Sequence, residues 1–435
     1  MPVSPEHNVV ATGGDPAGND DDADDAVEGE ADGDHAPAAD VGAPSEVGAD
    51  ALANLEAPSD DDGASAAPAG APAPPGTSSG RTITIAASGD LLVHQRVIRA
   101  AAAHAEQGGF AHVLSGLASV LVEDEIAFVN LETPLAHTFN ALQSDFPPVL
   151  GAPPEVAAAL TGAGVDVVSV ANNHAYDQTP AGLVASITES RSAGLAVIGG
   201  GDDVERAYEP WVTERDGVRI AFVAFADHLN ADAERWQSVV RVARLRDQRR
   251  VAASIERARS SADIVVAAVH WGADFATEPT PSQRAAARRL VDMGVDVIIG
   301  TGPHVLHEVE QMDSARGHAV VAYSLGNLVS NQGLKWAPGR RPQPTGPGDH
   351  DDDPRPRDGV VLRVRASVPT AGRVVVEAIE AVPLWTHNNW RRRASGLERV
   401  DDVRIVRLSE QDDVLYASRR AAIAEALGPF VRLMP

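Results

Sequence analysis

The sequence GVDVVSVANNHAYDQTPAGL at residues 164–183 combines an apolar run with an abrupt polar end. The run 165–170 is typical of a strand that is covered on both faces. It ends in Asn172, Asn173 and His174, and three consecutive polar residues are costly to bury unless a ligand or a hydrogen-bond network satisfies them. The segment therefore predicts a buried strand with a functional site at its end.

The same alternation of strand-like and helix-like segments extends on both sides of this segment, from residue 81 to about residue 390. Short β-branched and apolar runs alternate with longer Ala-, Leu- and Arg-rich stretches, which indicates an α/β fold. We predict strands at 82–88, 126–130, 165–170, 195–198, 218–225, 263–269, 295–299, 318–323, 359–366 and 373–382. We predict helices at 93–105, 110–122, 154–163, 180–192, 239–259 and 280–293.

Five other apolar runs also end in residues that bind metals or move protons. In open α/β sheets the loops after the carboxyl ends of the strands form the ligand crevice, so these polar ends are expected to converge. One such end would mean little, because a Gly-Asp pair is usually a turn and an isolated His is often structural. The five are Gly89-Asp90, Asn130-Leu131-Glu132, His270-Trp271-Gly272, Gly302-Pro303-His304 and Ser324-Leu325-Gly326-Asn327.

The donor types at these ends suit a hard or borderline divalent cation such as Mn, Fe, Zn or Mg. Two such cations could activate water near neutral pH, so a dinuclear centre is feasible. His174 is the candidate for proton transfer, and Asp177 either orients its imidazole or caps the following helix. The candidate metal ligands are Asp90, Glu132, Asn173, His270 and His304, with Asn327 as a further amide.

Other histidines carry weaker signals. His94 follows Asp90 by four residues and is expected on the surface of a first helical turn, and His307 is expected to face solvent. The sequence gives no context for His104, His112, His137, His228 and His318.

Charge and composition separate the first 80 residues from the remainder. The net charge is −26, of which −18 lies in residues 1–80, a segment rich in Ala, Asp, Gly and Pro that has no Lys or Arg. Such a segment buries too little apolar surface to fold, so we predict a disordered acidic tail. The negative field argues against nucleic acid as a partner. The absence of Cys excludes disulfides and thiolate catalysis.

The remaining boundaries follow from composition. We predict one domain at 81–390, a surface loop at 332–358 where Pro, Gly and charges accumulate, and a helical extension at 391–435. No signal peptide and no transmembrane segment is recognised in the sequence as given.

The order of the motifs resembles the CapA family, the bacterial capsule and poly-γ-glutamate biosynthesis proteins. The matching strings run across most of residues 81–390, and several motifs in order are far more specific than any one of them. They are SGD (88–90), NLETPL (130–135), APPE (152–155), residues 164–183, IGGG (198–201), HWG (270–272), GVDVIIGTGPHVLHEVE (294–310) and YSLGN (323–327).

The resemblance implies a metallophosphatase-like, four-layer α/β/β/α sandwich. It also implies that Asp90 and Glu132 are metal-binding carboxylates, that Asn173 and His174 act as an amide ligand and an assisting imidazole, and that His270 and His304 are later ligands. Two positions depart from the superfamily pattern, because Leu92 and Thr301 stand where histidines are usual. Each lost imidazole would weaken one metal position.

Three functions remain open at this point. The first is a divalent-metal-dependent hydrolase or transferase in the biosynthesis or anchoring of poly-γ-glutamate or another capsule polymer. The second is a non-catalytic polymer-binding or assembly component, and the third is a generic metallophosphoesterase. The resemblance implies an anionic envelope polymer as a partner, capsule-synthesis membrane proteins as further partners, and a cell-envelope or extracellular location.

Overall fold

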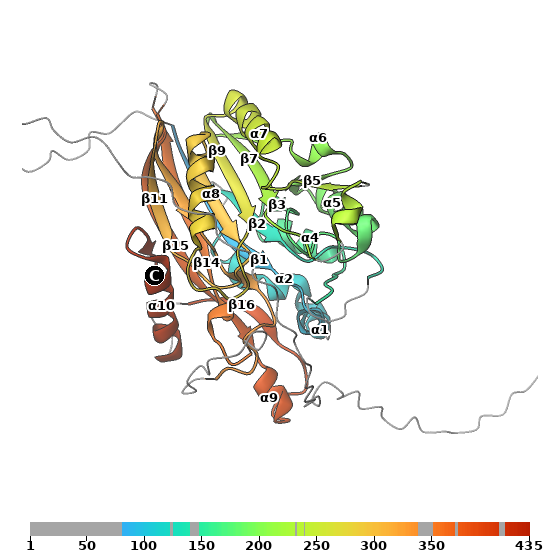
Figure 1. Cartoon of the computed structure of the whole chain (residues 1–435). Helices are drawn as coiled ribbons and strands as arrows, with labels where there is room; N and C mark the ends of the chain where they lie inside the picture. Colours follow the sequence, from blue (N-terminus) through green and yellow to red (C-terminus); the bar gives the residue numbers. More distant parts are fainter. Residues whose placement is uncertain are drawn as a thin grey trace, which may run out of the picture. The chain divides into compact units, whose positions relative to one another are not determined.

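The computed structural model describes residues 81–121, 125–139, 148–230, 233–238, 240–337, 351–369, 373–408 and 414–435 (Figure 1). The predicted acidic tail, residues 1–80, lies outside the described residues. Within the described ranges no helix has the length and apolar character needed to cross a bilayer.

The first sheet is built around β1 (Arg81–Leu91). On one side, β2 (Glu125–Leu131), β3 (Val167–Ser169) and β4 (Ala196–Ile198) follow in parallel. On the other side, β14 (Asp358–Val368), β15 (Val375–Asn388) and β16 (Val403–Arg407) follow in antiparallel order. The short strands β13 (Asn327–Val329) and β17 (Arg432–Leu433) pair with β1 and β15. The strand that follows β1 in the sequence, β2, therefore lies on one side of it, and the strands on its other side come from the C-terminal part of the chain.

The second sheet has a parallel centre and antiparallel edges, in the order β11-β12-β10-β9-β7-β6. Its centre contains β7 (Val218–Ala226), β9 (Ile264–His270), β10 (Val297–Thr301) and β12 (Gly317–Ala322). Its edges are β6 (Trp211–Arg215) and β11 (Val309–Ser314). A separate pair consists of β5 (Gly200–Gly201) and β8 (Arg241–Val242).

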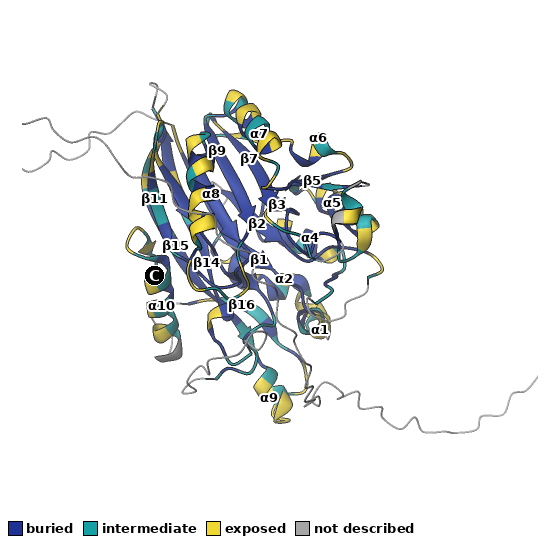
Figure 2. Cartoon of the chain, in the orientation of Figure 1, coloured by how far each residue is buried: buried dark blue, intermediate teal, exposed yellow. Residues whose placement is uncertain are grey.

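Alternate side chains of the second sheet point into two different cores. Phe222 on β7 and Val266 on β9 belong to the core that includes the first sheet. Their neighbours Val223 and Val265 belong to a second core. Since successive residues of a strand face opposite sides, the second sheet packs on the first sheet with one face and on helices with the other. Figure 2 shows the strands buried almost throughout.

The helices form the two outer layers. The second sheet is covered by α7 (Gln248–Ser261) and α8 (Pro281–Asp292), which begin at the caps Asp247 and Thr280 and present exposed outer faces (Figure 2). Thr280 and Gln283 form a capping box, with Pro281 in the first turn. The first sheet packs with α1 (Gln95–Ala103), α2 (Phe110–Val113), α3 (Ser115–Ala118), α4 (Glu155–Gly162) and α5 (Thr179–Ser192). The predicted four-layer α/β/β/α sandwich is confirmed.

The ten predicted strands are present, and several short elements were not predicted. The predicted helix 239–259 was wrong at its start, because β8 occupies 241–242 and α7 begins only after the Asp247 cap. The unpredicted elements include β6, β11, β13 and the four-residue α6 (Val204–Ala207). Each is too short to show a clear period, although β6 and β11 pair with the strands that directly follow them, β7 and β12.

The region after residue 390 contains strands as well as helices. It begins within α9 (Trp390–Ala394), continues through β16 and α10 (Val414–Leu427), and ends with β17. The pairing of β16 and β17 with β15 places both strands in the first sheet. Of the predicted loop 332–358, residues 338–350 lie outside the described residues, and a 3-10 turn at Arg355–Arg357 precedes β14.

Gly89 is expected to be indispensable for the fold. A Cβ added there would lie 1.8 Å from the backbone oxygen of Gly326, which also accepts the 2.9 Å hydrogen bond from the Asp90 N–H. Because backbone atoms on both sides hold that contact, we expect Gly89→Ala to lower the free energy of unfolding by about 3 kcal/mol or more. Chemical unfolding of the full chain measures this effect.

Gly162→Ala is the matched control for this substitution. Gly162 lies in the last turn of α4, and a Cβ there meets nothing within 4 Å. Alanine should stabilise that position by about 0.5–1 kcal/mol, because glycine is unfavourable in helices. Equal unfolding midpoints for the two variants would contradict the close approach of Gly89 and Gly326.

Candidate metal centre

The candidate site lies where parallel strands of both sheets end. The first sheet contributes the ends of β1, β2 and β3, and the second sheet contributes the ends of β7, β9 and β10. Parallel strands end at the same edge of their sheet, so the loops after them lie together. The polar strand ends noted in the sequence lie in the last residues of these strands and in the loops after them.

Asp90 is the most highly connected of these residues and is fully buried. Its Oδ1 accepts a 2.8 Å hydrogen bond from Asn130, and its Oδ2 accepts a 3.0 Å bond from the Gly302 N–H. The His304 Nδ1 lies 3.1 Å from Oδ2 and donates to it. Burial raises the pKa of Asp90, but the bond from His304 and the charges of His304 and His270 outweigh it and lower the pKa to about 2. Asp90 is therefore a carboxylate at neutral pH.

Glu132 is equally buried but has no hydrogen-bond partner at either carboxylate oxygen. Its Oε1 lies 3.6 Å from the His270 Nε2 and 3.9 Å from the His304 Nε2. Burial and then the charge of Asp90 raise the pKa of Glu132 well above its ordinary value. A buried carboxyl group without partners is costly, so its environment is incomplete in the absence of a cation.

His270 is held by side chains at the ends of β2 and β10. Its Nδ1 lies 3.1 Å from the Thr301 hydroxyl and 3.2 Å from the Asn130 amide nitrogen. Burial lowers the pKa of His270 to about 3, against the opposing effect of Asp90, so the ring is neutral. The Asn130 amide nitrogen can only donate, so Nδ1 accepts from it and the proton of the neutral ring lies on Nε2, 3.6 Å from Glu132 Oε1. Binding of a metal at Nε2 requires the other tautomer, in which Nδ1 carries the proton and can donate to Thr301.

His304 occupies an unusual backbone conformation. Its φ is +60°, a region that residues other than glycine seldom adopt, and it follows Gly302 with a φ of +113°. The turn aims its Nδ1 at both Asp90 Oδ2 and Asn327 Oδ1, each 3.1 Å away. Burial lowers the pKa of His304, but the bond to Asp90 outweighs it and the pKa is raised. Backbone strain of this kind is concentrated at functional sites.

Asn173 and His174 lie close to Asn230, a residue in the loop that follows β7 of the second sheet. The Asn173 amide nitrogen donates to Asn230 Oδ1 at 3.1 Å, while its own Oδ1 is buried without a hydrogen-bond partner. The His174 Nδ1 lies 2.6 Å from Asp177 Oδ2, and that carboxylate also accepts the Leu150 N–H at 2.7 Å. Asp177 thus orients the imidazole in the structure, whereas α5 begins two residues later without a side-chain cap.

The structure brings the predicted residues into one neighbourhood. One ligand atom each of Asp90, Glu132 and His304 lie within 4.8 Å of one another, and the His270 Nδ1 lies 3.8 Å from Asp90 Oδ1. The charge of His174 contributes to the lowered pKa of His270, and the charge of Asp177 contributes to the raised pKa of Glu132. Unpartnered oxygens on Glu132 and Asn173, beside neutral and anionic donors, fit a divalent cation.

Four further residues belong to this neighbourhood and were not predicted as site residues, although Asn130 stands in one of the polar strand ends noted in the sequence. Asn130 donates to both Asp90 and His270, and Asn230 accepts from the Asn173 amide. The ring centroid of His228 lies 6.3 Å from that of His270, and the charge of Asp274 acts on His304 and Glu132. His228 and Asn230 follow β7, so the strand-end signal that singles out the other residues was present there too.

Two expectations for histidines were wrong. His94 is buried, with its Nδ1 accepting a 3.2 Å bond from the Asn331 N–H, and burial lowers its pKa to about 4. His307 is 1% exposed and its Nε2 donates to the Ala276 carbonyl at 2.6 Å. Both rings fill space around the strand-end loops, where short-range sequence patterns do not show which side chains turn inward.

The fold and the site together define a four-layer α/β/β/α protein with carboxylates and imidazoles gathered at its strand ends. The model of the family "Bacterial capsule synthesis protein PGA_cap" matches residues 84–332, more than half of the chain. The chain therefore belongs to this family, and the resemblance to CapA proteins is confirmed.

Two relatives carry the CapA name. "Capsule biosynthesis protein CapA" of Bacillus anthracis is 30% identical over 187 residues, covering 42% of this chain and 44% of that protein. "PGA biosynthesis protein CapA" of Bacillus subtilis (strain 168) is 29% identical over 229 residues, covering 52% of this chain and 59% of that protein. The chain thus matches about half of the length of these relatives.

The chain also resembles solved structures, at lower sequence identity than the two relatives. A hypothetical protein from Thermus thermophilus has a TM-score of 0.38 at 18% identity, over 69% of this chain and 98% of that one. The Haemophilus influenzae NAD nucleotidase NadN has a TM-score of 0.40 at 10% identity, over 81% of this chain and 64% of that one. Both scores are below 0.5, and the four-layer assignment depends on the two sheets themselves.

Proposed function

We propose that the protein is a divalent-metal-dependent hydrolase or transferase that acts on poly-γ-glutamate or a related anionic polymer of the cell envelope. The observation that carries the proposal is the Glu132 carboxyl group, buried without a hydrogen-bond partner beside Asp90 and two imidazoles. Such a group is stable in a folded protein when a cation completes its environment. The proposed ligands are Asp90, Glu132, Asn173, His270 and His304.

A cation held there would polarise a scissile carbonyl or phosphoryl oxygen and acidify water. Proton transfer and the orientation of the ligands are assigned to residues of the chain. Asp177 holds a proton on the His174 Nδ1, so the Nε2 of that ring is the atom that gives or takes a proton at the reacting group. Asn230 keeps the Asn173 amide turned so that Oδ1 stays free.

The substrate class rests on the family. The names of the relatives refer to capsule and PGA biosynthesis, and we extend that role to this chain, together with a cell-envelope or extracellular location. Capsule-synthesis membrane proteins are the proposed partners. The net charge of the chain is negative, so cations at the site would reduce the repulsion of an anionic polymer.

Metal content and polymer turnover test the proposal together. The full chain is purified without a histidine tag, supplied with Mn, Fe, Zn or Mg, and analysed by plasma mass spectrometry. We expect Asp90→Asn to hold one or two equivalents fewer than the wild type. Asp313→Asn is the matched control, because Asp313 is 93% exposed and pairs only with the exposed His318 among the described ion pairs.

The metal-loaded protein is then incubated with poly-γ-glutamate, and polymer length is followed by size-exclusion chromatography. Shortening or transfer that depends on Asp90 supports the proposal. Metal binding with tight polymer binding but no turnover would instead favour an assembly role, and cleavage of simple phosphoesters alone would favour a phosphoesterase. Unchanged metal content in Asp90→Asn would refute the metal centre itself.

A further inference from the structure

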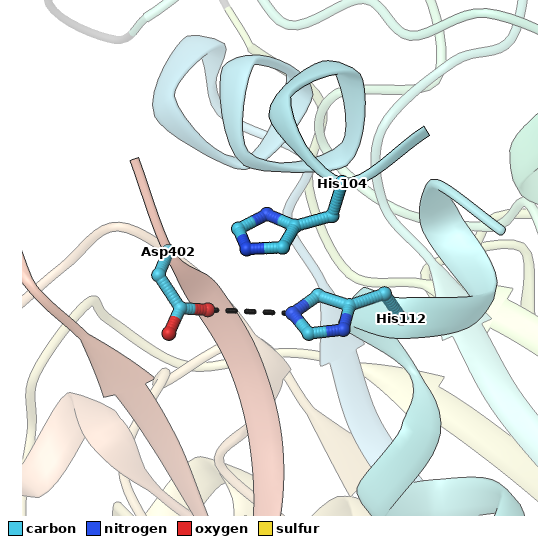
Figure 3. Close-up of side chains that lie close together, drawn as sticks. All are labelled: His104, His112 and Asp402. Atoms are coloured by element: carbon cyan, nitrogen blue, oxygen red, sulfur yellow. Dashed lines mark hydrogen bonds and ion pairs between the residues drawn. The ribbon is translucent and has the colours of Figure 1, made fainter. Parts of the chain in front are cut away.

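A second cluster of metal-binding side chains lies outside the candidate centre and shares no residue with it. Figure 3 shows His104, His112 and Asp402 facing one another, and one ligand atom from each lies within 4.8 Å of the others. His104 follows α1, His112 lies in α2, and Asp402 immediately precedes β16. The cluster therefore connects parts of the chain that are almost 300 residues apart.

We propose that His104, His112 and Asp402 form a second binding site for a transition-metal ion of the Zn²⁺ class, which fastens α1 and α2 to the edge strand β16. Two imidazoles and one carboxylate are a donor set typical of Zn²⁺, Co²⁺ or Ni²⁺, and a poor one for Mg²⁺ or Ca²⁺. The fourth position would be filled by water or by His387.

Distances within the cluster match ligands of one ion better than an ordinary ion pair. His112 Nε2 lies 3.4 Å from Asp402 Oδ1. This distance is long for a hydrogen bond. It is close to the roughly 3.3 Å that separates two ligands bound at about 2.0–2.1 Å to a tetrahedral ion. His387 Nε2 lies 3.4 Å from the other oxygen, Oδ2.

Two exposed pairs elsewhere on the protein provide the contrast. His137 lies 3.0 Å from Glu189, and His318 lies 3.0 Å from Asp313. Their rings are 76% and 64% exposed, whereas the His112 ring is 21% exposed. Neither pair belongs to a group of three such donors within the part of the chain that the structure describes.

Surrounding groups already orient two of the three donors. The His104 Nδ1 lies 2.9 Å from the Ala100 carbonyl and donates to it, so Nε2 keeps its lone pair free. Asp402 is held by Arg404, which pairs with Oδ2 and leaves Oδ1 toward His112. The Asp402 N–H also donates to Asn389 Oδ1 at 2.9 Å. This support resembles the outer shell that orients metal ligands.

One rearrangement accompanies binding. The rings of His104 and His112 are stacked, with centroids 4.2 Å apart and an angle of 5° between their planes. Parallel rings cannot both aim a lone pair at the same ion, so one imidazole must tilt out of the stack. Both rings are partly exposed, which leaves space for a rotation about the side-chain bonds.

Zinc content and zinc-dependent melting test this site. The full chain without a histidine tag is compared with His104→Asn, His112→Ala and, as matched controls, His137→Ala and His318→Ala. We expect each of the first two variants to lose one zinc equivalent that the controls retain. We also expect zinc to raise the melting temperature of the wild type and the controls by a few degrees more than that of His104→Asn and His112→Ala.

The Asp90 centre can also take up zinc, so the four variants are repeated in the Glu132→Gln background. If the zinc equivalent is lost in both backgrounds, it is assigned to the second cluster. This result does not depend on whether the proposed enzymatic function is correct. The two substitutions act independently on the cluster, so poor folding of one leaves the other informative. Zinc content and melting shifts equal to those of His137→Ala would overturn the proposal.

Discussion

Glu132→Gln is expected to abolish metal binding at the Asp90 centre while making the metal-free protein more stable. In the wild type, the folded state holds the Glu132 proton more tightly than the unfolded state, because burial raises the pKa above its ordinary value of 4.5. Stability is therefore lost as the pH rises through the raised pKa. Glutamine cannot ionise, so we expect a gain of about 1–2 kcal/mol at pH 8 in the metal-free state.

Glu125→Gln is the control for this result, since Glu125 lies at the other end of the same strand. Its carboxylate is buried but pairs with Arg363. We expect this change to destabilise the protein, because it leaves the half-buried Arg363 guanidinium without its counter-charge. We expect it to leave the metal content unaltered. Urea unfolding of chelator-treated protein between pH 5 and pH 8 measures both effects. Destabilisation of equal size in the two variants would show that Glu132 is a structural residue.

His174→Ala is expected to separate metal binding from turnover. The ring is fixed by Asp177 at 2.6 Å and is proposed to transfer a proton rather than to bind the cation. Loss of a positioned general acid or base costs on the order of 10²–10⁴-fold in rate. We therefore expect normal metal content with a fall in polymer turnover of that size. Mass spectrometry and chromatography of the polymer measure the two quantities on the same sample.

Asp177 should act through His174, which a double variant can show. Asp177→Asn is expected to give a smaller loss, and Asp177→Asn with His174→Ala should be no worse than His174→Ala alone. His137→Ala, at an exposed ring paired with Glu189, should behave like the wild type. Loss of metal in His174→Ala would make that ring a ligand, and additive losses would separate Asp177 from His174.

The sequence predicted those parts of the fold that are repeated along the chain. The predicted strands 165–170 and 263–269 are mostly apolar and end abruptly, so both their position and their direction could be inferred. The polar residues that follow them, including Asp90 and Asn173, were inferred on the same basis. The structure places these residues close together, and their roles remain predictions that the experiments above address.

The parts that were missed depend on contacts between distant residues. β13 and β16 are short strands whose partners are fixed only in three dimensions. Asn230 and Asp274 lie in the loops after β7 and β9. Asn230 accepts from Asn173 of the first sheet, and the charge of Asp274 acts on Glu132 of the first sheet. The cluster at His104 is a stronger case, because its third donor, Asp402, comes from the other end of the fold.

The order of strands around β1 has a consequence for protein synthesis. β2 begins at Glu125, soon after β1, whereas the strand on the other side of β1 begins only at Asp358. At about 5–20 residues per second, a ribosome needs roughly 10–60 s to make the residues between β1 and β14. For most of that time one edge of β1 has no partner strand and can pair with another nascent chain, since β13, which pairs only with the end of β1, begins at Asn327. Chaperone supply and slower growth should therefore improve the yield of this protein more than they improve that of proteins whose central strands pair with their sequence neighbours.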